Sequence, residues 1–445
     1  MNTPAARRDA RRAALDALLA FVEDRDARIL TKLDWRNLAP RDHRLAREIA
    51  LGVVRRRDLL DHVCAGFTPR GLPPRIETRF ALRIGAYQLM FLDRIPVHAS
   101  VAETVELCEG PSRGFVNAVL RRIAEHIGPT EETIGPKKDR VALPHGRVLT
   151  LGAPLPDPEA NPVDWLCVMG SLPREFVERW LARHGREKTF EMVAAANRPA
   201  GVTMRTVRVT REQLAERLAA EGVVTEPGVH ERILRWIDGS SPFTTAPYHD
   251  GWFVAQNVTA LRAALAVDAQ PGETILDLCA APGTKATLLA EAVGETGRVL
   301  AYDPDSKRRI RIVENVLRLR LPWLKIIEDP ERGAGADRVL ADVPCSNTGV
   351  LARRVEARYR LDRERIDSLV TLQRQILHTA LRLVKPGGRV VYSTCSIEEE
   401  ENQGVVAAVA AELGVTVEAE VATWPDLAYR DGGYYAVLRA PGGSG

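Results

Sequence analysis

Apolar residues recur with helical spacing throughout the first 130 residues. They occupy positions i, i+3, i+4 and i+7 in ARRAALDALLAFVED, DHRLAREIALGVVRRRDLLDHVC and TRFALRIGAYQLMFL, the pattern of amphipathic helices. SVAETVELCEG begins with Ser100, a plausible N-cap, and has Glu103 three residues later, as in a capping box. SRGFVNAVLRRIAEHI continues the helical pattern, and no alternating strand pattern interrupts it. We therefore predict an all-α domain over residues 1–130.

The pattern changes twice before it becomes regular again. Residues 131–163 are rich in Pro and Gly and have little periodicity, which predicts a linker with a short hairpin around His145-Gly146-Arg147. Residues 164–258 combine the helical stretches REFVERWLARHG, REKTFEMVAAANRP and TREQLAERLAAEG with the strand-like GVTMRTVRV. We predict a small α+β subdomain there.

Short apolar, β-rich runs alternate with helical patterns in the predicted last domain, residues 259–445. The runs are ETILDLC, RVLAYD, LKIIED, DRVLADVPC and RVVYSTC, and TVEAEVATW and YYAVLRA follow as two closing strands. Strands that alternate with helices indicate a mostly parallel, doubly wound sheet. The predicted fold class is α/β, preceded by the all-α domain and the α+β subdomain.

Composition excludes several classes of protein. Hydrophobic residues make up 45% of the 445 residues and charged residues 27%, which is ordinary globular usage and argues against extensive disorder. No apolar run is long enough to span a bilayer, and no apolar segment follows the N-terminal arginines as in a secretory signal. The six cysteines are scattered and form no CxxC pair, and no HExxH spacing occurs. We expect a cytoplasmic monomer with free thiols, no metal and no membrane partner.

Charge is distributed unevenly along the chain. The net charge is +3, yet residues 1–130 carry 22 Lys+Arg against 16 Asp+Glu. A basic front end favours an RNA-binding module, although a solvated arginine-rich surface has the same composition. The candidate phosphate contacts are Arg55, Arg56, Arg57, Arg353, Arg354, Arg358 and Arg360.

Candidate ligand-binding residues follow the first two strands of the predicted sheet. The first strand ends at Asp277, and the turn after it contains Cys279, Ala280, Ala281, Pro282, Gly283, Thr284 and Lys285. The second strand ends at Asp303, where an acidic side chain can bind ribose hydroxyls. The spacings GxGxxG and GxxxxGK[ST] are absent. We therefore expect an adenosyl ligand without a pyrophosphate.

Two cysteines follow the ends of two later strands. Cys345 comes after Asp342 in DVPCSNTGV, and Cys395 lies in YSTCSIEEEEN. Ligands of parallel sheets bind at the carboxyl ends of the strands, so both thiols are candidate nucleophiles. Lys285 can supply the positive charge that lowers a thiol pKa.

The motifs LDLCAAPGTK, DVPCSNTGV and YSTCSIEEEEN resemble the signatures of the S-adenosylmethionine-dependent RNA 5-methylcytosine methyltransferases. The segments RIGAYQLMFLDRIPVHASVAETVELC and FVNAVLRRI are similar to the RNA-binding fold of the antitermination factor NusB. The fusion of the two is typical of bacterial enzymes that methylate 16S rRNA. The resemblance implies a Rossmann-like methyltransferase domain, S-adenosylmethionine as the cofactor and RNA as the partner.

The resemblance also implies residue roles. Cys395 adds to C6 of the cytosine, which makes C5 nucleophilic, and Cys345 assists release of the product. Asp342 contacts the edge of the base, and Lys285 contacts the base and supports the thiolate. The cofactor residues are those of the loop Cys279–Lys285, together with Asp303 for the ribose, Asp329 near the adenine and Asp342 near the methionine.

The chain departs from the family pattern in a few places. Thr284 replaces a glycine, which predicts a tighter turn because β-branched residues disfavour positive φ. Asn257 replaces an aspartate, Asn347 replaces a glycine, and Pro330 follows Asp329 where a glycine is usual. None of these changes removes a catalytic group.

Three alternatives remain open at this point. They are a tRNA cytosine-C5 methyltransferase, a DNA cytosine-C5 methyltransferase with its nucleophile at Cys345, and a non-catalytic RNA-binding or antitermination factor. The intact set of Lys285, Asp342, Cys345 and Cys395 counts against the last.

Overall fold

The computed structural model describes residues 9–36, 38–132, 135–428 and 430–442. The remaining parts of the predicted N-terminal domain, linker and catalytic domain lie outside the described residues. The chain forms two compact units, residues 1–198 with 354–361, and residues 199–353 with 362–445. Each unit is described by itself.

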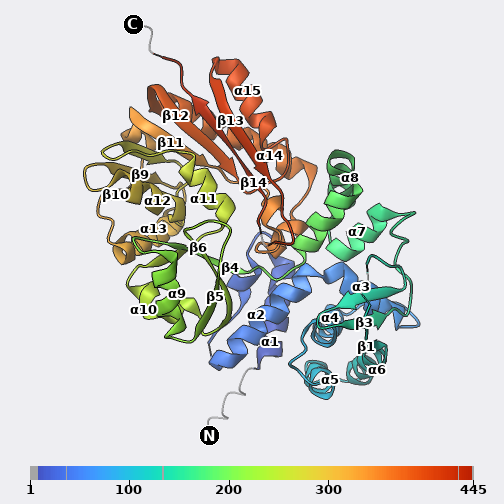
Figure 1. Ribbon diagram of the computed structural model, residues 1–445. Coiled ribbons are helices and arrows are strands. Elements are labelled where there is room, and N and C mark those ends of the chain that lie inside the picture. Colours follow the sequence, from blue (N-terminus) through green and yellow to red (C-terminus); the bar gives the residue numbers. More distant parts are fainter. Residues whose placement is uncertain (1–8, 37, 133–134, 429, 443–445) are drawn as a thin grey trace. The chain divides into compact units, whose positions relative to one another are not determined.

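Helices make up most of the first unit, as the apolar spacing predicts (Figure 1). They are α1 (Ala10–Glu23), α2 (Pro40–Arg55), α3 (Arg57–Gly66), α4 (Ile76–Phe91), α5 (Val97–Val105), α6 (Ser112–Glu125), α7 (Pro162–Gly170) and α8 (Arg174–Ala196). A short 3-10 helix, Ile29–Lys32, lies between α1 and α2. Helix α4 is buried along nearly its whole length, which makes it the central helix of this bundle.

The predicted N-cap of α5 is wrong. The helix begins at Val97 with Pro96 as its N-cap, so Ser100 lies inside it, and the Ser100 amide donates to the carbonyl of Pro96 at 2.9 Å. Proline fixes φ near the helical value and starts a helix readily. That preference places the start three residues before the serine.

The segment predicted as a linker contributes two strands, and the end of the segment predicted as all-α contributes a third. Strands β1 (Ile127–Pro129), β2 (Arg140–Leu143) and β3 (Arg147–Thr150) form an antiparallel sheet in the order β1-β3-β2. The hairpin predicted around His145 is confirmed: His145 and Gly146 have positive φ and join β2 to β3. The first unit also contains α8, which the sequence grouped with residues 164–258.

A short peptide from late in the chain belongs to the first unit. It contains the 3-10 helix Val355–Tyr359, and its Arg358 is 1% exposed. The Arg358 guanidinium donates to the carbonyls of Arg55, Gly170 and Ala196 at 2.5, 2.5 and 3.2 Å. Arg358 is therefore a buried structural residue, and the predicted phosphate contact is wrong for it.

The predicted patch at Arg55, Arg56 and Arg57 is likewise occupied by protein contacts. Arg55 is 3% exposed. The guanidinium of Arg56 lies 4.2 Å above the ring of Phe91 and donates to a backbone carbonyl. Arg57 pairs with Asp58 at 2.7 Å. At the junction of α2 and α3, Arg55 and Arg56 are thus taken up by protein contacts, whereas the ion-paired Arg57 keeps 37% of its side chain exposed.

The second unit begins with a small antiparallel sheet. Its strands are β4 (Val202–Thr206), β5 (Val223–Pro227), β6 (Ile233–Gly239) and β7 (Phe253–Ala255), in the order β5-β6-β4-β7. Helices α9 (Arg211–Ala219) and α10 (Ala246–His249) and a 3-10 turn, Pro242–Thr244, connect them. The capping box of Thr210 and Gln213 starts α9. This sheet adds three strands to the single one that the sequence indicated.

A seven-stranded sheet forms the rest of the second unit, as predicted. Its order is β10-β9-β8-β11-β12-β14-β13; the first five strands pair in parallel, and β14 runs antiparallel to both β12 and β13. The strands are β8 (Thr274–Asp277), β9 (Arg298–Tyr302), β10 (Leu324–Ile327), β11 (Ala336–Asp342), β12 (Val384–Thr394), β13 (Thr416–Thr423) and β14 (Gly433–Arg439). The helices are α11 (Val258–Leu265), α12 (Thr284–Val293), α13 (Ser306–Leu319), α14 (Arg363–Leu383) and α15 (Gln403–Leu413). Three 3-10 turns, Pro330–Gly333, Thr348–Val350 and Val355–Tyr359, lie between them, the last within the first unit.

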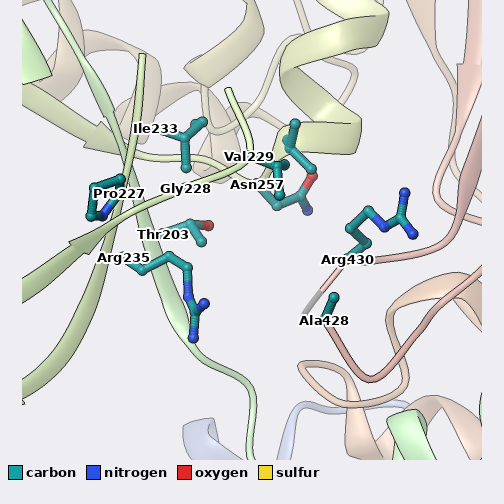
Figure 2. A pocket seen from close by; sticks show the side chains of 10 residues that line it. Thr203, Pro227, Gly228, Val229, Ile233, Arg235, Asn257, Ala428 and Arg430 are labelled. Atoms are coloured by element: carbon teal, nitrogen blue, oxygen red, sulfur yellow. The ribbon is translucent and has the colours of Figure 1, made fainter. Parts of the chain in front are cut away.

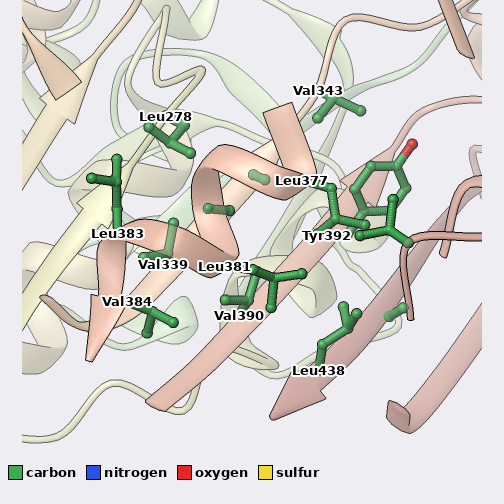
Figure 3. Close-up of a cluster of buried hydrophobic side chains, with 14 of the residues drawn as sticks. Leu278, Val339, Val343, Leu377, Leu381, Leu383, Val384, Val390, Tyr392 and Leu438 are labelled. Carbon is green, nitrogen blue, oxygen red and sulfur yellow. The ribbon is translucent and has the colours of Figure 1, made fainter. Parts of the chain in front are cut away.

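Consecutive residues of the central strands face opposite hydrophobic clusters. Leu276, Val339 and Val390 pack with α14 and α15 in one cluster, shown in part in Figure 3. Ile275, Leu340 and Val391 pack with α12 and α13 in the other. A strand buried on both faces shows a continuous apolar run, which explains why ETILDLC and RVVYSTC lack alternation. This double burial holds the carboxyl edge of the sheet, where the candidate residues lie, on a rigid base.

Candidate functional site

The loop after β8 forms a tight cradle. The chain passes from Asp277 through a cis Ala281-Pro282 bond to Gly283, which has φ of 98° and caps α12. A Cβ on Gly283 would meet Ile312 at 3.3 Å. The left-handed residue is therefore Gly283, and Thr284 is the first helical residue, so the tightened turn predicted for Thr284 is wrong. Glycine at this point lets the backbone approach a ligand closely.

Two buried carboxylates border this cradle. Asp303, fully buried at the end of β9, accepts the amides of Ala281 at 3.2 Å and Asp305 at 3.1 Å. Asp277 is 1% exposed, and its Oδ2 has no hydrogen-bond partner among the described residues. Burial, reinforced by the charge of Asp342, raises the pKa of Asp277 to about 8. A buried acceptor without a donor suits a ligand with hydroxyl or ammonium groups.

These features fit S-adenosylmethionine. Asp303 holds the first loop closed and lies where a ribose is bound in doubly wound sheets. The unpartnered oxygen of Asp277 and the loop Cys279–Lys285 complete the cradle. The Cys279 thiol has its pKa raised, chiefly by burial, so its backbone is the part that can serve the ligand.

Asp329 lies at the end of β10 and is exposed. Its side chain accepts the amide of Glu331 at 3.0 Å and caps the turn Pro330–Gly333. The proline that replaces the family's glycine thus begins a short 3-10 helix. The assignment of Asp329 to the adenine stays a prediction.

Lys285 and Asp342 form an ion pair beside the candidate cysteines. The ammonium of Lys285 lies 2.5 Å from Oδ2 of Asp342, and Ser393 donates to Oδ1 of the same carboxylate at 2.7 Å. Burial lowers the pKa of Lys285, but Asp342 and, to a smaller extent, Cys395 outweigh burial, so this pKa lies above its ordinary value. Lys285 is therefore a permanent cation at neutral pH within the electrostatic reach of Cys395.

The two candidate thiols lie together. Cys345 and Cys395 follow the neighbouring strands β11 and β12, and their sulfurs are 3.0 Å apart. Cys395 Sγ also donates to Oδ1 of Asn347 at 3.3 Å. Asn347 adopts the left-handed conformation that the family's glycine would take. The hydrogen bond between Cys345 and Cys395, followed by burial, raises the pKa of Cys345, which keeps Cys345 a protonated thiol.

A buried carboxylate that the sequence did not single out joins the two cysteine loops. Glu401 is fully buried. It accepts the Ser346 amide at 2.9 Å, the Ser396 hydroxyl at 2.5 Å and the Gln373 amide group at 2.9 Å. It occupies the last position of the run Glu398–Glu401, which looks like a solvated face in sequence. The only signal is that this run directly follows the Thr-Cys motif.

A second buried cluster supports the same loops from another direction. Asp431, 6% exposed, accepts from Arg353 at 2.6 Å and from Asn257 at 2.7 Å. Arg353 also donates to the carbonyl of Gly201. Arg353 is thus held by protein groups, against the predicted RNA contact. Asn257, the departure from the family's aspartate, donates a hydrogen bond that a second carboxylate would not supply.

Neither a membrane-spanning helix nor a metal-binding cluster is seen in the described part of the chain. No helix there has the length and apolar character needed to cross a membrane. No three His, Cys, Asp or Glu side chains gather there in a way that would hold a metal ion.

Comparison with known proteins identifies both parts of the chain. Residues 264–428 match the family described as 16S rRNA methyltransferase RsmB/F, and residues 8–125 match the NusB family. Ribosomal RNA small subunit methyltransferase B of Vibrio cholerae is 33% identical over 382 residues, which covers 82% of this chain and 80% of that protein. A probable counterpart from Synechocystis is 31% identical and covers 86% and 83%.

The fold is shared with a solved structure. The crystal structure of PH0851 matches with a TM-score of 0.72 and 24% identity over 96% of this chain and 98% of that one. The predicted resemblance, including the NusB-like domain, is therefore confirmed. The chain belongs to the RsmB/F family of S-adenosylmethionine-dependent rRNA methyltransferases and carries a NusB-family domain before its methyltransferase domain.

Proposed function

We propose that this protein methylates C5 of a cytosine in 16S rRNA through a covalent adduct with Cys395. The observation that carries the proposal is the pair of thiols, 3.0 Å apart at the carboxyl ends of β11 and β12. Chemistry at a ring nitrogen or a ribose hydroxyl needs no thiol. Methylation of C5 needs one, because the carbon is a poor nucleophile until a thiolate adds to C6.

Each side chain of the site has a role in methyl transfer that follows from its position and contacts. The Cys395 thiolate forms a bond to C6, and the electrons of the C5–C6 double bond become available at C5. Lys285 stabilises the thiolate before it adds, and Asp342, oriented by Lys285 and Ser393, accepts a hydrogen bond from the base edge. S-adenosylmethionine supplies the electrophilic methyl group. The loop Cys279–Lys285, Asp277 and Asp303 hold it.

Release needs the C5 proton to leave and the bond between carbon and sulfur to break. The electrons of the C5–H bond restore the double bond as water takes the proton, and the electron pair of the C6–S bond returns to Cys395. Cys345 retains its proton because its pKa is raised. A thiol at 3.0 Å can donate a hydrogen bond to the departing thiolate.

Substitution of the two cysteines separates their roles. Undermodified 16S rRNA is incubated with labelled S-adenosylmethionine, and the products are examined by nucleoside mass spectrometry and by denaturing gels. We expect Cys395→Ala to abolish 5-methylcytosine and the covalent complex. We expect Cys345→Ala to accumulate a complex that survives denaturation, because addition proceeds while release stalls.

Cys167→Ala is the matched control, because Cys167 lies in α7 of the first unit. It should form 5-methylcytosine at the wild-type rate. Turnover by Cys395→Ala would refute the assignment and favour Cys345 as the nucleophile. Label in 5-methylcytosine only when tRNA is supplied would retain the chemistry and replace the substrate.

A further inference from the structure

The second unit contains a small, open hollow that the proposed chemistry does not use (Figure 2). It lies between the hairpin of β5 and β6, the start of α11 and the loop that precedes β14. Pro227, Val229, Ile233 and Val258 give it apolar walls. Val229 is 62% exposed and gives the hollow an apolar face that is open to solvent.

Two arginines also line the hollow. Figure 2 shows Arg235 and Arg430 on opposite sides of it. Their side chains are 29% and 46% exposed. Asp426 accepts from Nε of Arg430 at 2.6 Å, and Glu226 lies 3.7 Å from Nη1 of Arg235. These carboxylates orient the guanidinium groups, which stay partly exposed to solvent.

The hollow lies close in space to Cys395, as the following distances show. Arg430 is three residues before Gly433, and at about 3.6 Å per residue their Cα atoms are at most about 11 Å apart. A Cβ on Gly433 would lie 3.6 Å from the Cα of Cys395. Asn257 also lines the hollow, and its side chain donates a hydrogen bond to Asp431, the residue after Arg430. The next nucleotide of a splayed RNA strand spans such a distance.

We propose that this hollow binds the nucleotide adjacent to the target cytosine, with its base against Pro227 and Val229 and its phosphates at Arg235 and Arg430. The inference rests on the proposed function for the identity of the target. Apolar walls suit the face of an unstacked base, and guanidinium groups suit phosphate. The two kinds of contact together bind a nucleotide without reading its sequence.

Two classes of variant test the hollow. Arg235→Ala and Arg430→Ala remove charge, and Ala428→Phe narrows the hollow without changing charge. RNA affinity is measured by filter binding to undermodified 16S rRNA over a range of salt concentrations, and KM and kcat are measured in the methylation assay. Binding of S-adenosylmethionine and circular dichroism confirm that each variant is folded. Arg217→Ala is the matched control, since Arg217 is exposed on α9 and does not line the hollow.

We expect each arginine variant to raise the KM for RNA about tenfold and to reduce the slope of log affinity against log salt by about 1. Ala428→Phe should raise KM and leave the slope unchanged. Values of kcat at saturating RNA should stay near wild type in all of them.

The outcomes distinguish this inference from the proposed function. Unchanged KM and salt slope in both folded arginine variants would overturn the inference, whatever base is methylated. If the salt slope falls as expected but the wild type forms no 5-methylcytosine in any RNA, the hollow stands as an RNA contact and the proposed function fails. An equal effect of Arg217→Ala would show a general charge effect and also overturn the inference.

Discussion

Asp277 combines full burial with an oxygen that no described donor satisfies. Its folded pKa of about 8 exceeds the ordinary value of 3.8. The folded state therefore binds a proton that the unfolded state releases. This contribution to stability is complete below about pH 4 and is lost as pH rises through about 8.

Asp277→Asn should remove that pH dependence. We expect the free energy of unfolding of the wild type to fall by about 3–4 kcal/mol more than that of the variant between pH 5 and pH 8, because each pKa unit in this interval corresponds to about 1.36 kcal/mol. Urea unfolding of the protein without cofactor at several pH values measures the difference. Asp250→Asn, at an exposed position, should follow the wild-type curve; parallel curves for Asp277→Asn would show that Asp277 is ionised when folded.

Glu401 shows how a buried carboxylate can position two catalytic loops without taking part in the reaction itself. It accepts from Ser346, beside Cys345, and from Ser396, beside Cys395. Glu401→Gln places an amide donor where those groups require an acceptor. We expect kcat to fall about 10- to 100-fold, since small displacements of reacting groups have effects of that size.

The KM for S-adenosylmethionine should change little in Glu401→Gln, because the cradle after β8 is a separate loop. Single-turnover methylation and the rate of adduct formation measure the loss. Glu399→Gln, exposed in the same acidic run, should behave like wild type. A rise in both KM values with unchanged kcat would exclude a positioning role.

At the level of elements, the sequence predicted the strands of the seven-stranded sheet but only one strand of the small antiparallel sheet. Strands β8 to β12 are apolar on both faces and were each predicted, and so were the closing strands β13 and β14. Strands β5 and β6 escaped prediction because their residues are largely exposed: β5 has one buried position. β6 pairs with β4 and β5 pairs with β6, so these strands are specified by their neighbours in the sheet and not by their own pattern.

The residues of the candidate site also fall into two groups, those placed by strand ends and those placed by the packing of loops. Cys345, Cys395, Asp342 and Lys285 were predicted to lie together because strand ends of a parallel sheet share one edge, and the structure places them together. The contacts of Glu401 and Asp431 could not be predicted, since they depend on how loops distant in sequence pack. Phosphate contacts were wrongly expected for the buried Arg55 and Arg358 for a related reason: composition shows charge but not burial.

At the level of the whole molecule, the two units are not separated by a single cut in the chain. Residues 354–361 lie between β11 and α14 in sequence but belong to the first unit. Arg358 anchors them through three backbone carbonyls. Burial lowers the pKa of Arg358 to about 10, so the guanidinium is still charged at neutral pH. Its removal leaves buried carbonyls without donors.

Arg358→Met should therefore destabilise the first unit by about 2–4 kcal/mol, through lost hydrogen bonds to a charged donor and unpaired carbonyls. Hydrogen exchange of the full chain measures where the loss occurs. We expect faster exchange in α2, α7, α8 and residues 354–361, whereas strands β8 to β12 should keep their protection. Arg332→Met, at an exposed arginine, should change neither region. Uniformly faster exchange in both units would mean that they unfold as one cooperative body, and that the peptide carrying Arg358 couples the NusB-family domain to the methyltransferase sheet instead of stabilising only the unit that it enters.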